Sequence, residues 1–315
     1  MNAGQKEKVQ KSEALRGIGL MMLAVLSMVG VDVSAKWLSS DYALSQIVFV
    51  RGLLAIACLL VIFLATGNLR DLKTAQPAVH LLRSLLASGA IFGFFFALAN
   101  MPLAEAVTIT FAAPLIVSAL SQPVLGEHVG SRRWSAVTAG FLGVLMVLRP
   151  GARLLDPAAL SALAATLCYA FLILTARIFR RTETAASLAL YPFVIPTFTA
   201  ALLVRGGWTT PPALHWIPFA LCGVFGALAY LLMNRALTLA PPSLLAPFEY
   251  TCILGAVTAG YLIWGETPDA GTLAGAAVII GSGVYIIHRE RVLAAQKEKP
   301  VFNDQSAKTG SASQL

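Results

Sequence analysis

Ten apolar stretches of about 16 to 24 residues follow one another along the chain, separated by short polar segments. A helix of about 20 residues, rising 1.5 Å per residue, crosses a hydrocarbon layer of roughly 30 Å. Such a helix also satisfies its own backbone hydrogen bonds, which lipid cannot do. The chain is therefore expected to form an all-α membrane bundle of ten transmembrane helices, over residues 17–38, 44–65, 79–99, 102–125, 133–148, 157–176, 184–204, 215–237, 241–264 and 270–288.

The composition agrees with lipid as the solvent. Hydrophobic residues make up 57% of the chain and charged residues only 12%, whereas a soluble domain carries about 25% charged residues. A water-soluble domain of this size could not cover its surface with so few charges. The apolar run 91–96 (IFGFFF) does not alternate, which argues against barrel strands.

Basic residues predict the orientation of the bundle. If the N-terminus lies inside, the inner segments hold eighteen of the 23 lysines and arginines, with Arg83 among them, and the outer segments hold four. The remaining one, Arg51, falls within the second span. Because basic residues collect on the cytoplasmic side, residues 1–16 and the polar tail 289–315 are both expected there, the tail without fixed structure.

An internal repeat with an offset of 139 residues relates the two halves. Pro102 matches Pro241, and the pair Gly126–Glu127 matches Gly265–Glu266. Each copy has a helix, a proline-initiated helix, a Gly-Glu pair and a glycine-rich helix in the same order. With five helices per half the second half is inverted, which is the arrangement of many secondary transporters. The predicted halves are residues 17–151 and 152–288.

These features resemble the drug/metabolite transporter superfamily, in its ten-helix EamA type. The resemblance is carried by the segments 101–106 (MPLAEA), 126–127 (GE), 148–151 (LRPG) with Gly140 and Gly143 before it, and 264–266 (WGE). It extends to Asp32, the pair Lys36–Trp37 and the segment 46–51 (QIVFVR). The resemblance implies two five-helix halves around a central cavity, in a multi-pass protein of a bacterial inner (plasma) membrane that moves small metabolites, often amino acids.

The functional hypothesis is export of amino acids or related small metabolites by alternating access. One alternative is uptake or exchange of a bulkier metabolite such as S-adenosylmethionine, which the region around Asp32 and Arg51 also resembles in the family. An intramembrane enzyme would need clustered histidines or paired carboxylates, and a purely structural membrane protein would not need a mid-membrane acid. We predict no catalytic residue, metal ligand, cofactor or nucleic-acid contact; the partners are a small-molecule substrate, the lipid bilayer and, as candidate coupling ions, protons.

Charged residues inside spans cost about 2.5–3.5 kcal/mol or more at the bilayer centre, so they are functional candidates. Asp32 and Arg51 both lie roughly 9–11 Å from the outer ends of their spans. The matching depth predicts an ion pair, with Lys36 one turn away as a competitor for Asp32. The pair either pins the first two helices together or takes part in gating and substrate contact.

Glu249 is expected near mid-membrane with no cation nearby on its helix. It could take up a proton or bind a substrate ammonium, or it could be a protonated structural carboxyl. Tyr250 follows it, and the repeat places Thr110 and Phe111 opposite. Further candidates for substrate contact are Tyr169 on the sixth span and, sharing a face of the eighth, Tyr230 and Asn234; helix packing is the alternative for Tyr230.

Two prolines and three acids complete the predictions. Pro114 and Pro247 lie in the fourth and ninth spans, where a proline removes a backbone hydrogen bond and kinks the helix; a moving hinge there is a hypothesis. Glu105 is expected to be a solvated acid at a helix start. Glu127 and Glu266 are interpreted as structural, each complementing the N-terminus of the helix that follows it.

Overall fold

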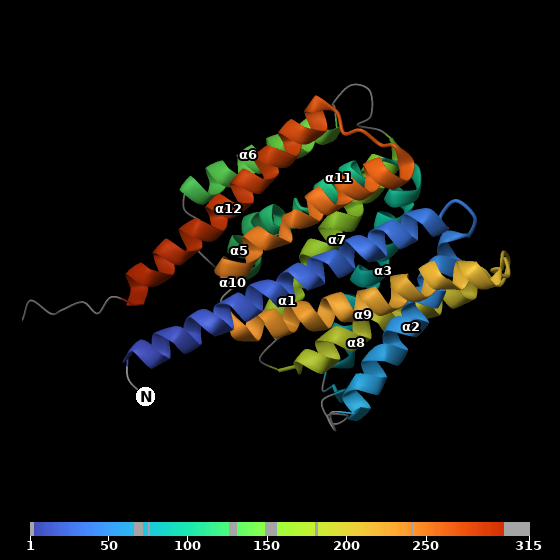
Figure 1. Ribbon diagram of the computed structural model, residues 1–315, viewed down its shortest axis with the longest axis horizontal. Helices are drawn as coiled ribbons and strands as arrows, with labels where there is room; N and C mark the ends of the chain where they lie inside the picture. Colours follow the sequence, from blue (N-terminus) through green and yellow to red (C-terminus); the bar gives the residue numbers. More distant parts are fainter. Residues whose placement is uncertain are drawn as a thin grey trace, which may run out of the picture.

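A computed structural model describes residues 3–65, 72–74, 76–125, 131–148, 156–179, 182–240 and 242–298 of the chain. Within these ranges the fold is entirely helical and has no strand (Figure 1). The helices are α1 (Ala3–Leu38), α2 (Leu44–Ala65), α3 (Pro77–Asn100), α4 (Leu103–Thr110), α5 (Ala113–Leu125), α6 (Ser131–Leu148), α7 (Pro157–Phe179), α8 (Ala185–Val204), α9 (Trp216–Leu239), α10 (Pro242–Glu249), α11 (Thr251–Trp264) and α12 (Ala270–Glu298).

The prediction of an all-helical membrane bundle is confirmed. Eight segments of the described chain are long and apolar enough to cross a membrane, and Trp134–Leu148 is a shorter apolar helix. The fourth and ninth predicted spans are each divided in two, α4 with α5 and α10 with α11. Counting each divided pair once, the order of elements is five segments followed by five.

Three expectations need correction. Helix α1 begins at Ala3, well before the predicted span, and α12 continues to Glu298, so the first part of the tail is helical; residues 289–298 include the good helix formers Ala, Gln, Lys and Glu. Arg83 does not belong to an inner segment but lies within α3, only 3% exposed. The later tail and the pair Gly126–Glu127 are outside the described residues.

The main helix contacts join one half of the protein to the other. In Figure 1, α1 lies along α9, and α6 lies along α12. Helix α3 in turn packs on α7, and α2 packs on both α8 and α9. The α6–α12 contact is close because glycines face each other: a Cβ atom at Gly143 would lie 2.9 Å from the Gly275 carbonyl oxygen. The core of the protein therefore lies between the halves.

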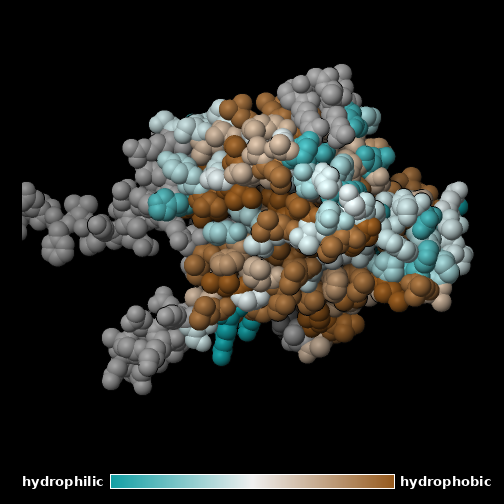
Figure 2. All heavy atoms as spheres, turned by 45° about the horizontal axis from the view of Figure 1, so that its top comes forward, coloured by the Kyte–Doolittle hydropathy of each residue, from teal (hydrophilic) through white to brown (hydrophobic). Residues whose placement is uncertain are grey.

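The outer surface of the bundle is apolar, as a lipid-facing surface must be. Figure 2 shows brown, apolar atoms over much of the middle of the visible face, with the darkest teal atoms toward its ends. Large hydrophobic side chains are exposed along many helices, including Leu53, Leu142, Leu203, Leu254 and Leu262. This surface and the spanning helices identify a multi-pass membrane protein.

Candidate substrate-binding site

The two divided helices meet at their breaks. Helix α4 ends at Thr110 and α11 begins at Thr251, and the residues beside these ends, Phe111 and Tyr250, differ by the repeat offset of 139. Their rings lie 5.2 Å apart between centroids. The hydroxyl of Tyr250 lies against Gly283 of α12, where any larger side chain would clash with it. The breaks thus place matching residues of the two halves in contact inside the bundle.

Proline explains both breaks. Pro114 is the second residue of α5, where a helix does not need the missing N–H. Helix α4 cannot continue through Pro114, because the proline ring clashes with the carbonyl group four residues earlier. Pro247 lies within α10, three residues before Tyr250, and removes an N–H from the ladder just before the break. The two prolines lie on opposite sides of the repeat-related positions. Their role as moving hinges stays a prediction.

An ion pair joins the halves at one end of the bundle, which we call the Lys36 end. The Lys36 ammonium lies 2.7 Å from Glu266 and donates a second hydrogen bond to the Met101 carbonyl oxygen. Glu266 also accepts a hydrogen bond from the Leu103 backbone N–H at the start of α4 (2.8 Å). Gly265, with φ of 69°, turns the chain sharply after α11 so that Glu266 can reach both groups.

These contacts correct two predictions. The Asp32–Arg51 ion pair does not form: no contact within 4.0 Å joins the two groups, and Lys36 pairs with Glu266 instead of competing for Asp32. Glu266 caps α4 of the other half, whereas α12, the helix that follows it, is capped by Asp269, which accepts a hydrogen bond from the Thr272 N–H. Sequence spacing along one helix could not reveal partners on distant segments.

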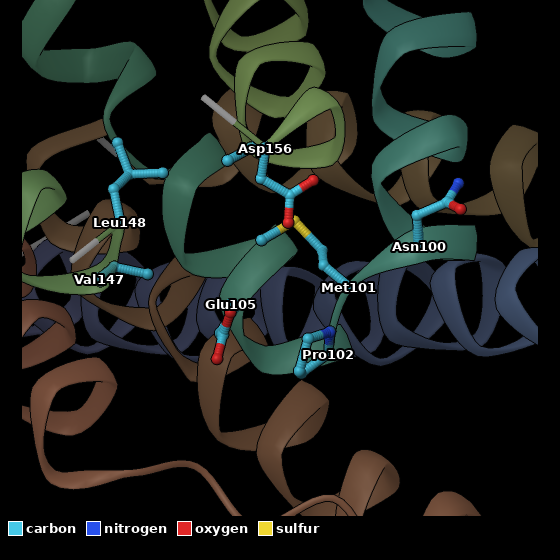
Figure 3. Close-up of a pocket in the computed structure, with 8 residues that line it drawn as sticks. Asn100, Met101, Pro102, Glu105, Val147, Leu148 and Asp156 are labelled. Atoms are coloured by element: carbon cyan, nitrogen blue, oxygen red, sulfur yellow. The ribbon is translucent and has the colours of Figure 1, made fainter. Parts of the chain in front are cut away.

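A pocket opens beside this ion pair (Figure 3). It encloses about 450 Å³, its mouth included, and its labelled residues come from α3, α4, α6, the link between α3 and α4, and the residue before α7. Glu105, expected to be solvated, lines the pocket but is only 6% exposed, because α4 is buried among other helices. Asp156 also lines the pocket and caps α7 through the Ala158 N–H.

Helix packing is closer at the Lys36 end. Here α4 packs on α11 and α12, and α1 packs on α3 and α4. The repeat relates these pairs to α10 with α5 and α6, and to α7 with α9 and α10. Among the described helices those related pairs have no comparable packing. The structure is thus closed more firmly at the Lys36 end than at the opposite one.

The opposite end, which we call the His80 end, has a buried acid–base cluster. His80 of α3 lies 3.0 Å from Glu183, which precedes α8. Glu183 also accepts hydrogen bonds from Thr74 (2.9 Å) and Ser187 (3.2 Å), and the His80 ring packs on Tyr191. Sequence spacing does not single out His80 as a candidate, because its partner is 103 residues away.

This cluster predicts a pH-dependent stability. The hydrogen bond from His80 holds the pKa of the Glu183 carboxyl below its ordinary value of 4.5; Thr74 and Ser187 act in the same direction and burial opposes them. A carboxyl with a lowered pKa stabilises the fold above its unfolded-state pKa and loses this effect as the pH falls. We expect the wild type to unfold a few degrees above Glu183→Gln near neutral pH, and the gap to close below about pH 4.5.

Thermal unfolding in detergent at a series of pH values measures this gap. Glu13→Gln, which removes an exposed carboxylate from α1, is the matched control and should leave the unfolding temperature unchanged throughout. A Glu183→Gln gap of the same size at acidic and neutral pH would contradict the role given to the carboxylate.

Arg83 shows how this protein pairs the terminal nitrogens of a buried cation. Its guanidinium donates hydrogen bonds to the Leu172 carbonyl oxygen (2.9 Å), the Thr175 hydroxyl (2.9 Å) and the Leu188 carbonyl oxygen (3.2 Å). The Leu188 oxygen is available because the residue four positions later, Pro192, has no N–H. The proline spacing was the sequence signal for this contact. Arg83 joins α3 to α7 and α8 as a structural residue.

Three other charged residues within the spans have no such partners. Asp32 of α1, Arg51 of α2 and Glu249 at the end of α10 make no hydrogen bond or ion pair within the described part of the chain. Asp32 is only 9% exposed, and the Arg51 Nε atom is sealed from solvent. Unpaired buried charges are costly and mark pathways for solutes in membrane proteins.

Tyr169 faces the same interior. The exposed residues Leu160, Leu167 and Ile178 form the lipid-facing stripe of α7, and Tyr169 lies about 180–200° around the helix from them. It is nevertheless 40% exposed, so its accessible surface lies on the inner side of the helix. Its hydroxyl is close enough to Glu249 and Tyr230 to interact electrostatically with both.

The remaining predicted residues are placed as follows. Thr110 donates its hydroxyl hydrogen bond to Val107 of its own helix, and Phe111 contacts Tyr250. Tyr230 and Asn234 are both in α9, but the side chain of Asn234 is not among those described. No group of three or more metal-ligating side chains occurs in the described chain.

Two halves that pack helix against helix in an apolar bundle, with broken helices that meet beside Glu249, a charged residue without a partner among the described residues, define a membrane transporter. The chain belongs to the EamA-like transporter family: the family pattern matches residues 15–149 and, separately, residues 156–288. Membership of this family identifies the chain as a transporter and not an enzyme.

Similar proteins cover nearly the whole chain. A Rickettsia bellii (strain RML369-C) protein named S-adenosylmethionine uptake transporter is 28% identical over 89% of this chain and 96% of its own length. A riboflavin transporter of Rhizobium johnstonii (strain DSM 114642 / LMG 32736 / 3841) is 26% identical over 90% of this chain and 94% of its own. A solved structure with 18% identity and a TM-score of 0.61 covers 91% of this chain and 99% of that one, and supports the fold.

Proposed function

We propose that this transporter carries S-adenosylmethionine or a closely similar charged nucleoside. The observation that carries the proposal is a set of charges within the spans that have no ion-pair or hydrogen-bond partner among the described residues: two carboxylates (Asp32 and Glu249) and one guanidinium (Arg51). S-adenosylmethionine carries the complementary set: an ammonium, a sulfonium and a carboxylate. The aromatic rings of Tyr169 and Tyr250 suit its adenine and its cationic centre.

The other candidate substrates use this set less well. Riboflavin is uncharged and would leave all three groups unpaired. A simple amino acid would neutralise one carboxylate and the guanidinium and leave the second carboxylate unpaired in the membrane. Relatives named for S-adenosylmethionine uptake support the same choice. Amino-acid export, the first hypothesis, stays a prediction to be tested beside it.

Transport would proceed by alternating access between the halves. The predicted orientation places the Lys36 end outside the cell and both termini in the cytoplasm of a bacterium, with the inner membrane as the location. In that orientation the structure corresponds to a state closed toward the outside. Residues 17–151 and 152–288 would move against each other about Pro114 and Pro247.

Uptake into proteoliposomes tests the substrate. We expect saturable flux of labelled S-adenosylmethionine, competed by the unlabelled compound and not by riboflavin. A panel of labelled amino acids, with protein-free liposomes as the control, tests the alternative. Saturable flux of an amino acid or of riboflavin, without flux of S-adenosylmethionine, would overturn the proposal.

A further inference from the structure

Arg51 is held in place by rings and not by charges. Its guanidinium carbon lies 5.5 Å from the ring centroid of Phe95 on α3 and 5.7 Å from that of Phe193 on α8. Gly226 of α9 faces it, so that a Cβ atom there would lie 3.4 Å from a terminal guanidinium nitrogen. Cation–π contacts of this kind fix the plane of the group without using its N–H donors.

None of the five N–H donors of Arg51 has a protein acceptor in the described chain. Arg83 is the internal comparison, because both of its terminal nitrogens donate hydrogen bonds to oxygens on neighbouring helices, although its Nε atom, like that of Arg51, has no acceptor among the described residues. The fold therefore can satisfy the terminal nitrogens of a buried guanidinium where that group is structural. Arg51 is instead oriented and left with donors that fit a carboxylate in a bidentate manner.

Asp32 is the counterpart of Arg51. Its carboxylate is buried on α1 and accepts no hydrogen bond from the described residues, while the hydroxyls of Ser27 and Ser34 on the same helix donate to backbone carbonyl oxygens of that helix. No contact within 4.0 Å joins the charged groups of Asp32 and Arg51. Both residues are nevertheless beside α9: the Cys222 thiol lies 3.9 Å from the carbonyl oxygen of Val31, the residue before Asp32, and Gly226, one turn further along α9, faces the Arg51 guanidinium. Two opposite charges are therefore held close to each other without forming an ion pair.

We propose that Asp32 and Arg51 together bind the α-amino-acid group of the substrate. The substrate ammonium would bind the Asp32 carboxylate and its carboxylate would bind the Arg51 guanidinium, so that the two protein charges are paired through the ligand. This inference rests on the proposed function and assigns the amino-acid end of the substrate to α1 and α2. Glu249 and Tyr169 are then left for its other end.

Two labelled probes separate the roles of the two residues. S-adenosylmethionine has both the ammonium and the carboxylate, and decarboxylated S-adenosylmethionine keeps only the ammonium. In Arg51→Gln the apparent affinity for S-adenosylmethionine is expected to fall about 10- to 100-fold. The apparent affinity for the decarboxylated probe is expected to change less than about threefold. Asp32→Asn is expected to weaken both probes, because both retain the ammonium.

Arg205→Gln, which removes an exposed arginine after α8, is the control and should change neither probe. Arg51→Lys keeps the positive charge. If it binds S-adenosylmethionine better than Arg51→Gln does, the loss in Arg51→Gln comes from the missing charge and not from misfolding. Equal losses for both probes in Arg51→Gln would overturn the assignment of the carboxylate, as would a wild type that does not distinguish the probes.

If the wild type carries neither probe, the proposed function has failed, and the pair is tested without it. The thermal stability of purified protein is then measured with methionine and with 3-methylthiopropylamine, which lacks the carboxylate. Stabilisation by methionine alone, lost in Arg51→Gln, would support the assignment. Equal shifts with the two compounds, or none, would overturn it.

Discussion

A Lys36→Met variant is expected to open the Lys36 end of the bundle and to raise the labelling rate of a cysteine placed at Ala104 about tenfold, which corresponds to about 1.4 kcal/mol. Ala104 is buried at the start of α4, next to Leu103, whose N–H donates a hydrogen bond to Glu266. Removing the ammonium leaves Glu266 without its cation and the Met101 oxygen without its donor. A half-buried carboxylate left alone disfavours the closed state.

The measurement uses a membrane-impermeant maleimide and peptide mass spectrometry at that cysteine. Glu266→Gln keeps an acceptor for the α4 N–H while it removes the charge, so it separates the ion pair from the helix cap. Combining Lys36→Met with Glu266→Gln should add little to the larger single effect, since both act on one contact. Lys73→Met, at an exposed position of the His80 end, is the control. An unchanged rate in Lys36→Met would show that this pair does not hold the end closed.

Glu249→Gln is expected to reduce transport of the cationic substrate at least about tenfold, since truncating one partner of a buried charge pair costs about 2–5 kcal/mol. Glutamine preserves the shape and one acceptor, so the loss reports the charge. Initial rates in proteoliposomes at a series of pH values measure it, with Glu13→Gln as the carboxylate control. If a proton is coupled at this site, the pH profile of the variant flattens.

Two other results would contradict this role. Wild-type rates with wild-type pH dependence would make Glu249 a structural carboxyl. A loss of transport together with a matching loss of protein from the monodisperse peak in size-exclusion chromatography would assign it to folding.

Much of the fold was predictable because lipid imposes simple rules. Length and apolarity alone locate the segments, and α2 has the predicted bounds of 44–65. The breaks at Phe111 and Tyr250 were less predictable in position, because a proline shows that a ladder is interrupted but not which residue leaves the helix. The repeat offset nevertheless aligned the two residues that meet there.

The candidate site shows what sequence cannot provide. Depth arguments found Asp32, Arg51 and Glu249, since a charge within a span is visible in the sequence. The same arguments paired Asp32 with Arg51 and missed that two phenylalanines from α3 and α8 orient the guanidinium. They also missed Lys36 with Glu266 and His80 with Glu183, because these partners are separated by more than 100 residues and meet only when the halves assemble.

The packing of first-half helices on second-half helices has a consequence for biosynthesis. Helix α1 ends at Leu38 and its main packing partner, α9, begins only at Trp216. At 5–20 residues per second, the ribosome needs roughly 10–35 s to bridge that interval. During this time the face of the N-terminal helix that packs on α9 has no protein partner. Lipid, water defects or the insertion machinery must shelter that face until the second half arrives.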